Sequence, residues 1–342
     1  MVDYFLILGA IIGVGFASGK EICVFFFDFG GASLLGLTAF ALLYVYLFFV
    51  IQHISHKLKL NSYSEFNAAV FGKLCKISNV VMLINFAITS AGMLAGADYL
   101  FQTFFGVGYK IPSLVLSVLT LVLLIGGIDK IKIVANVIIP VMIAVIVINS
   151  IKNITPQNVN LEITARNSYM AVYYGILFGV NNFVAAMPVL FETKQRTKTK
   201  AFVIISICMI ILLNILVFAS NKFSTDMPMF ELSANVSKSF YYIYFATLIL
   251  ALFSTLMICS YNTMKIISKD KKSIFIALIV VLFNLILSNF GYAFIVKYLY
   301  VISGIISGIY VLLLIIFMTI KFLKFKNKNK KLNKNDKKPP IK

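Results

Sequence analysis

The chain has 342 residues, of which 61% are hydrophobic and only 13% are charged, and its mean hydropathy is +0.96. A soluble globular domain has roughly half of its residues apolar and about a quarter charged, so this composition excludes that class and predicts an all-α polytopic membrane protein. The net charge of +19 is interpreted first as a topology signal, because Lys and Arg concentrate in cytoplasmic loops, and it does not predict a nucleic-acid partner.

The first predicted element is an apolar stretch that is interrupted by GVGFASGKE at residues 13–21. These residues do not form a P-loop, because Val14 stands where that motif requires glycine and Glu21 where it requires Ser or Thr. The glycine spacing also differs from the dinucleotide fingerprint. Only Asp3 precedes the apolar run, so we expect a retained first span rather than a cleaved signal peptide.

Further apolar segments follow along the whole chain. A bilayer core of about 30 Å requires roughly 20 apolar residues per helix, and ten segments qualify or nearly qualify. They are residues 4–29, 32–53, 78–105, 112–126, 133–151, 168–191, 201–220, 240–264, 273–288 and 298–320.

The loops between these segments alternate in basic charge. Most Lys and Arg residues fall in the loops around 57–76, 130–132, 194–200 and 265–272 and in the tail. This bias predicts that both termini are cytoplasmic, and residues 324–342 are expected to form a basic, disordered cytoplasmic tail. The four cysteines are scattered, which does not indicate a disulfide framework or a metal site.

The ten spans divide into two sets of five with matching irregularities. Glycines interrupt span one in GVGFASG and span six in GILFGVNNFVAAMP; spans three and eight are long, and spans four and nine are short. An odd number of spans per half inverts the second half in the membrane. The pattern therefore predicts a 5+5 inverted repeat with discontinuous helices 1 and 6. Repeat one would be 1–155 and repeat two 156–323, within a single transporter domain 1–323.

The two interrupted spans predict a substrate site, because irregular backbone at membrane depth is tolerated where it lines a cavity or is buried in protein. Half-helix N-termini attract carboxylates, and free carbonyls suit a sodium ion or an ammonium group. The predicted substrate-binding residues are Gly13, Gly15, Phe16, Ala17, Ser18, Gly19, Asp98, Tyr99, Gly179, Asn181 and Asn182. The alternative is that the small residues serve close helix packing.

Ionisable residues inside predicted spans cost several kcal/mol unless they are paired or hydrated. Lys20 and Asp98 come at similar depth along helices one and three. We therefore expect them to approach each other, directly or through water, beside the substrate cavity. Glu21 is the expected proton acceptor if transport is coupled to protons.

The stretch GVGFASGKEICVFFFDFG resembles the first-helix signature of the YkvI-like membrane proteins, a bacterial family within the amino acid-polyamine-organocation (APC) superfamily. By span count the resemblance covers nearly the whole chain. It implies the five-plus-five inverted repeat of the leucine-transporter fold and a location in the bacterial cytoplasmic membrane. It also implies that Tyr99 presents its hydroxyl to a substrate carboxylate, although simple packing would equally explain this tyrosine.

Sodium-coupled members of this fold hold an ion between helices one and eight. The resemblance implies that its ligands here are the carbonyls of Gly9 and Ile12, with Ala251, Ser254 and Thr255 on helix eight. Positions i, i+3 and i+4 share one helix face, and hydroxyl oxygens suit a hard cation. The alternative is that both hydroxyls bond to the preceding helical turn. Span five has no lysine that could replace the ion, which favours sodium.

These features predict a secondary active transporter of a small zwitterionic or cationic solute, expected to be an amino acid, with sodium favoured over protons for coupling. The alternative is a non-transporting amino-acid receptor that resembles the membrane subunit of spore germinant receptors. An ion channel is disfavoured, because the interruptions are paired in inverted halves. We expect no enzymatic activity and no cofactor other than a sodium ion. The expected partners are a small-molecule substrate and the lipid bilayer.

Overall fold

The computed structural model describes residues 14–60, 62–106, 108, 110–126, 128–154, 164–191, 211, 225–267 and 274–335, which are helical or turn and include no strand. Six helical segments are long and apolar enough to cross a membrane: 27–57, 63–105, 133–153, 166–191, 238–267 and 292–320. Two shorter apolar helices, Ile111–Gly126 and Ile274–Phe290, accompany them. The prediction of an all-α polytopic membrane protein is therefore confirmed. Residues 4–13 of span one and nearly all of span seven lie outside the described residues.

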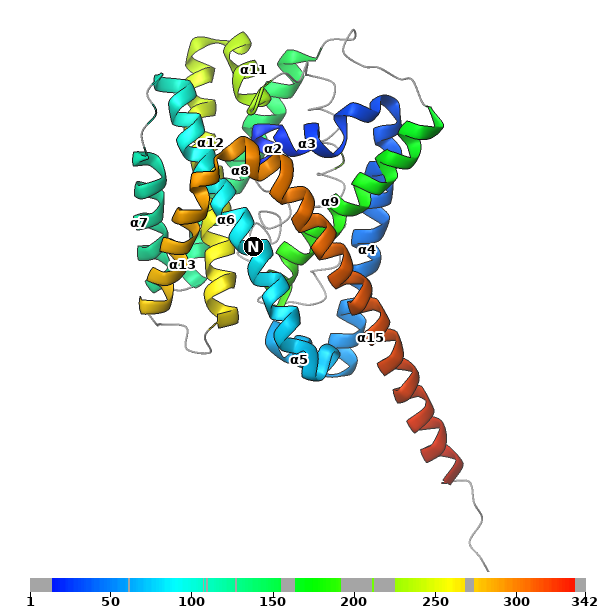
Figure 1. Ribbon diagram of the computed structural model, residues 1–342. Coiled ribbons are helices and arrows are strands. Elements are labelled where there is room, and N and C mark those ends of the chain that lie inside the picture. Colours follow the sequence, from blue (N-terminus) through cyan, green and yellow to red (C-terminus); the bar gives the residue numbers. More distant parts are fainter. Residues whose placement is uncertain are drawn as a thin grey trace, which may run out of the picture.

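The long helices form two groups that meet along α6 (Figure 1). One group contains α6 (Cys75–Phe105), α7 (Ile111–Gly126), α8 (Ile128–Asn153), α12 (Lys238–Ile267) and α13 (Ile274–Leu287). The other contains α4 (Ser33–Lys57), α9 (Ala165–Phe191) and α15 (Tyr300–Asn335), and α15 packs against α6. A short helix, α5 (Tyr63–Phe71), precedes α6 at one end of the molecule.

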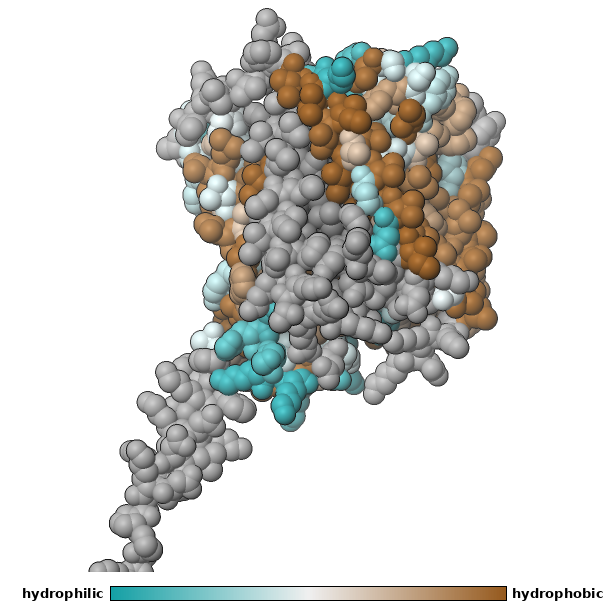
Figure 2. Space-filling view, turned by 180° about the vertical axis from the view of Figure 1, so that it is seen from behind, coloured by the Kyte–Doolittle hydropathy of each residue, from teal (hydrophilic) through white to brown (hydrophobic). Residues whose placement is uncertain are grey.

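The surface of the helices fits a lipid environment. The exposed side chains of α7 include Leu114, Val118, Val122 and Ile125, and hydrophobic residues cover much of the flank in Figure 2. Hydrophilic residues gather mainly at the two ends in the same view. Large apolar surfaces of this kind are rare on soluble monomers, so the outer faces of the helices are suited to contact acyl chains.

Helix one is discontinuous, as predicted. Its described part consists of α2 (Val14–Ser18) and α3 (Lys20–Phe25), which Gly19 separates with a φ of 79°. A 3-10 segment, Phe27–Ala32, then leads into α4. Figure 1 shows α2 and α3 at the same end of the molecule as α11 (Pro228–Val236).

The predicted break in helix six is wrong. α9 runs without interruption from Ala165 to Phe191 and includes Gly179, Asn181 and Asn182. The glycines instead allow close packing on α4, because a Cβ atom at Gly175 would overlap the backbone of Gly36, and one at Gly179 would lie 3.2 Å from Phe40. The alternative of helix packing through small residues therefore applies to this span.

The predicted tail begins within α15, and residues 336–342 lie outside the described residues. α15 continues as a helix to Asn335, and Figure 1 shows its C-terminal part projecting beyond the other helices. Lys is a good helix former and no proline lies between the start of α15 and Pro339, so nothing in the local sequence stops the helix at residue 324.

Candidate functional site

Gly19 forms the break in helix one for two physical reasons. Its φ of 79° lies in the left-handed region, which glycine adopts without the steric cost that a Cβ atom brings. A Cβ atom at this position would also lie 2.8 Å from Cγ of Met229 and 3.1 Å from Cγ of Pro228. The break therefore depends on glycine and is covered by the first turn of α11.

Side chains satisfy several of the backbone groups that the break exposes. The Tyr244 hydroxyl on α12 donates to the carbonyl of Ala17 at 2.7 Å. The Ser18 hydroxyl accepts from the N–H of Lys20 at 3.2 Å and donates to the carbonyl of Gly15 at 3.2 Å. Ser18 thus acts as a local cap between α2 and α3, a role that small hydroxyl residues commonly take.

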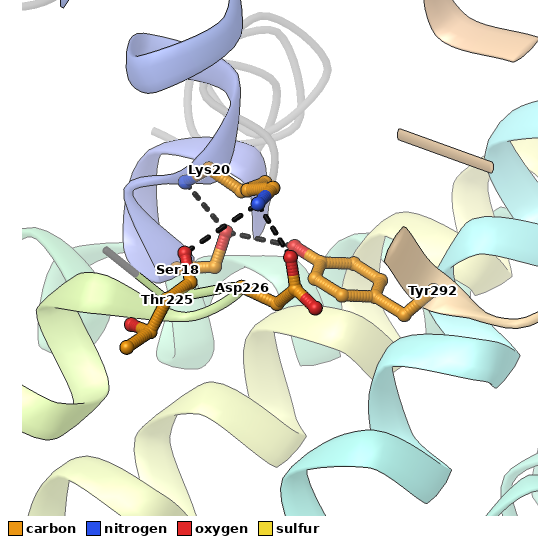
Figure 3. Close-up of polar contacts among 5 residues, drawn as sticks. All are labelled: Ser18, Lys20, Thr225, Asp226 and Tyr292. Atoms are coloured by element: carbon orange, nitrogen blue, oxygen red, sulfur yellow. Dashed lines mark hydrogen bonds and ion pairs between the residues drawn. The ribbon is translucent and has the colours of Figure 1, made fainter. Parts of the chain in front are cut away.

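A pair of tyrosines lines the break on its other side. The Tyr292 hydroxyl donates to Oγ of Ser18 at 3.0 Å, as Figure 3 shows. The Tyr292 ring stacks on Tyr99, with a centroid distance of 5.8 Å and an interplanar angle of 30°. The structure therefore brings the predicted residues Ser18 and Tyr99 together through Tyr292, which the sequence reasoning missed.

Lys20 is paired, but with a different residue from the one predicted. Its Nζ lies 2.5 Å from Oδ1 of Asp226 and 3.4 Å from the carbonyl oxygen of Thr225 (Figure 3). Asp226 comes just before α11, so this ion pair ties that segment to the break in helix one. No local signal in the sequence pairs residues that are so far apart along the chain.

The predicted contact between Lys20 and Asp98 is therefore wrong. Asp98 lies 3.1 Å from Nζ of Lys110 and accepts from the N–H of Ser113 at 3.0 Å. Ser113 lies in the first turn of α7, where a carboxylate stabilises free N–H groups. Asp98 thus stabilises the connection between α6 and α7 and is not in contact with Lys20.

Glu21 lies directly at the break. Its carboxyl group packs against Gly15, where an added Cβ atom would overlap it. Its helix, α3, packs against the segment Ile295–Leu299, which lies between Tyr292 and Tyr300. Within the described part of the chain, no ion pair neutralises Glu21. An ionisable side chain without an ion-pair partner is costly inside a membrane protein and usually marks a functional site, so Glu21 is the residue of this site that most strongly indicates a function.

Asn181 belongs to a second polar cluster, between α6, α9 and α15. Its Oδ1 accepts from Nδ2 of Asn85 at 2.6 Å, from the Ser303 hydroxyl at 2.9 Å and from the Ser307 hydroxyl at 3.3 Å. Asn182 donates to the carbonyl of Phe178 at 3.0 Å, within its own helix. The sequence reasoning missed Asn85, Ser303 and Ser307, although the last two recur at i and i+4 in an apolar span.

The predicted sodium ligands are described only in part. Gly9, Ile12 and the neighbouring Gly13 lie outside the described residues, and Phe16 lies in α2. Ala251 and Ser254 are buried on α12, which packs against α2. The Ser254 hydroxyl donates to the carbonyl of Ala251 at 2.9 Å, so its oxygen keeps its lone pairs for another donor or a cation.

Comparison with known proteins finds two relatives in Bacillus subtilis (strain 168). The chain is 31% identical over 140 residues to a protein named "Uncharacterized membrane protein YkvI", and 28% identical over 144 residues to one named "Uncharacterized protein YyaD". Each match covers 41% of this chain and 40% of the relative, so the chain matches about two fifths of either relative's length. No family model matches the chain.

Proposed function

We propose that the protein is a secondary active transporter of a small solute, expected to be an amino acid, that works by ion-coupled alternating access. The observation that carries this proposal is the break in helix one at Gly19, with the carboxyl group of Glu21 packed beside it. Ionisable groups and interrupted helices inside membrane proteins usually mark solute or ion pathways. We also propose that the protein is not an enzyme.

The proposed architecture is ten spans in a 5+5 inverted repeat, with both termini in the cytoplasm and the protein in the bacterial plasma membrane. Helix lengths support the repeat: α6 and α12 have 31 and 30 residues, and α7 and α13 have 16 and 14. These pairs occupy corresponding places in the two proposed halves. The unbroken α9 distinguishes this chain from the pattern with two interrupted helices.

Sodium is the proposed coupling ion. Ser254 is buried on the helix that packs against α2, and Thr255 is adjacent to it. Hydroxyl and carbonyl oxygens are the ligands that hard cations prefer. A receptor that binds an amino acid without moving it would not require this ion site, so ion dependence separates the two functions.

The test is uptake of radiolabelled amino acids into proteoliposomes with an inward gradient of sodium or of potassium. We expect sodium-dependent uptake that Ser254→Ala/Thr255→Ala reduces at least about tenfold, the equivalent of roughly 1.4 kcal/mol. Thr38→Ala is the matched control, because Thr38 is exposed and its hydroxyl also donates to the preceding turn of its helix, at Leu34. Binding without uptake would instead support the receptor, and uptake indifferent to sodium would exclude sodium coupling.

A further inference from the structure

Tyr292 and Tyr300 pack against one side of α6. A Cβ atom at Gly96 would lie 3.2 Å from the ring of Tyr292, and one at Gly92 would lie 3.1 Å from the hydroxyl oxygen of Tyr300. Gly92 and Gly96 are one helical turn apart on α6 and make room for the two rings. Both tyrosines are therefore packed against the same face of α6.

A π-helical segment brings the two tyrosines onto that face. Residues Ile295–Leu299 form this segment, between α14 (Tyr292–Phe294) and α15. In a regular α-helix, positions 292 and 300 would point about 80° apart, because each residue turns by about 100°. A π turn contains one more residue than an α turn, so it reduces the angle between the two side chains to nearly zero. Such turns are frequent at functional sites.

The two hydroxyl groups differ in their hydrogen bonds. The Tyr292 hydroxyl donates to Ser18, whereas the Tyr300 hydroxyl is buried and has no hydrogen-bond partner in the described part of the chain. Tyr300 itself is 4% exposed. Thr89 on α6 donates its own hydroxyl to the carbonyl of Asn85 at 2.9 Å. A buried polar group without a partner is energetically costly, so the Tyr300 hydroxyl is available for a ligand.

Glu21 supplies the charge at the same place. Its helix, α3, packs against the π segment Ile295–Leu299 that separates the two tyrosines, and its neighbour Lys20 is already paired with Asp226. Glu21 is half-buried, and an ionised carboxylate that is partly removed from water without a cation is costly. Glu21 therefore requires a proton or a cationic partner that enters from outside the described chain.

We propose that Glu21 and the Tyr300 hydroxyl bind the ammonium group of the transported solute, so that the solute is an amino acid or amine with a free amino group. This inference rests on the proposed transport function and names its substrate class. An ammonium group offers three N–H donors, which suit the carboxylate oxygens and the phenolic oxygen. An anionic solute is disfavoured, because Lys20 is occupied by Asp226 and Glu21 would repel it.

The test measures ligand binding to the purified full-length protein in detergent, by calorimetry and thermal shift. The probes are the standard amino acids, their N-acetyl derivatives, and 2-aminobutyrate, butylamine and butyrate, which share one carbon skeleton. We expect binding only by compounds with a free amino group. Glu21→Gln should weaken it at least about tenfold, or roughly 1.4 kcal/mol, and Tyr300→Phe should weaken it severalfold. Glu231→Gln is the matched control, because Glu231 is exposed on α11.

Several results would overturn this inference: no amine binds, N-acetylated compounds bind as well as free amines, or both variants bind amines like the wild type. A Glu21→Gln variant that loses only the pH dependence of stability would identify a proton site instead. If Glu21→Gln fails to fold, Tyr300→Phe decides, because it removes only an unpartnered hydroxyl. Amine binding without uptake would contradict the transport function alone, whereas uptake that Glu21→Gln and Tyr300→Phe leave unchanged would contradict this inference alone.

Discussion

At the scale of single residues, Gly15 and Glu21 depend on each other. The Glu21 carboxyl group occupies the space that any side chain at position 15 would need. Gly15 is therefore required because the Glu21 side chain occupies the space beside it. Gly19 is required because of its φ of 79° and its contact with α11. The two positions of this motif thus require glycine for different physical reasons.

Gly15→Ala is expected to displace the Glu21 carboxyl group. Overpacking of this kind costs about 1–3 kcal/mol, and we expect a matching loss of unfolding free energy and weaker amine binding. Thermal unfolding in detergent measures the first effect. Gly308→Ala is the control, because a Cβ atom there would meet nothing closer than Val180 at 3.9 Å; it should leave stability unchanged or raise it by up to about 1 kcal/mol. Equal effects of both substitutions would contradict the contact.

At the scale of elements, α11 is held over the break in helix one from two sides. Nδ2 of Asn149 donates to the carbonyl of Met229 at 2.7 Å, and Nδ2 of Asn153 donates to that of Leu232 at 3.2 Å, both from α8. The ion pair between Lys20 and Asp226 holds it from helix one. α11 thus connects the proposed site to α8.

The ion pair at α11 should contribute more than the second ion pair of the described chain. Lys20 and Asp226 side chains are 17% and 29% exposed, whereas Lys110, which pairs with Asp98, is 55% exposed. We expect Lys20→Gln to lower the unfolding free energy by about 1 kcal/mol and Lys110→Gln by less than about 0.5 kcal/mol. A double-mutant cycle with Asp226→Asn isolates the pair; no coupling energy in that cycle would show that α11 is held without it.

The polar cluster around Asn181 has a different role at this scale. It joins one residue each of α6 and α9 to two of α15 through hydrogen bonds of 2.6 to 3.3 Å. Buried polar side chains in a membrane bundle require such partners, because water is absent. The cluster therefore sets how the group of α4, α9 and α15 sits on α6, which is the interface between the two groups of helices.

At the scale of the whole molecule, the distribution of basic residues predicts an orientation in the membrane. α11 and α5 lie at opposite ends of the molecule (Figure 1), and the basic loops predict that the α5 end is cytoplasmic. The candidate site, with Glu21, Lys20 and Asp226, lies toward the other end. The predicted orientation therefore places the candidate site toward the outer side of the membrane, where the first turn of α11 covers it.

Cysteine labelling checks this orientation. In a variant without the four native cysteines, we expect a membrane-impermeant maleimide to modify Ala234→Cys in intact cells, because Ala234 is exposed on α11. Lys73→Cys, exposed beside α5, should react only after the membrane is permeabilised. The opposite pattern would reverse the orientation and place the candidate site toward the cytoplasm.

Part of the site was accessible from the sequence alone. Glycines and an acidic side chain in an apolar span indicated the break at Gly19 and the importance of Glu21, because both are costly in a membrane without a specific reason. The same reasoning failed for α9, which has no break. There Gly179 packs against Phe40 of α4, and Asn181 accepts a hydrogen bond from Asn85 of α6. Local sequence does not distinguish a glycine that permits a break from one that permits close packing.

The sequence by itself determined the helical membrane-protein class and the positions of the six long and two shorter apolar helices that the structure describes, because hydrophobicity and length are local properties. Only the tertiary structure decided the partners of the charged and polar groups. Lys20 pairs with Asp226 rather than Asp98, and a π turn brings Tyr292 and Tyr300 to one face of α6. These contacts join residues that are distant along the chain, so they depend on how the helices pack and not on any one segment.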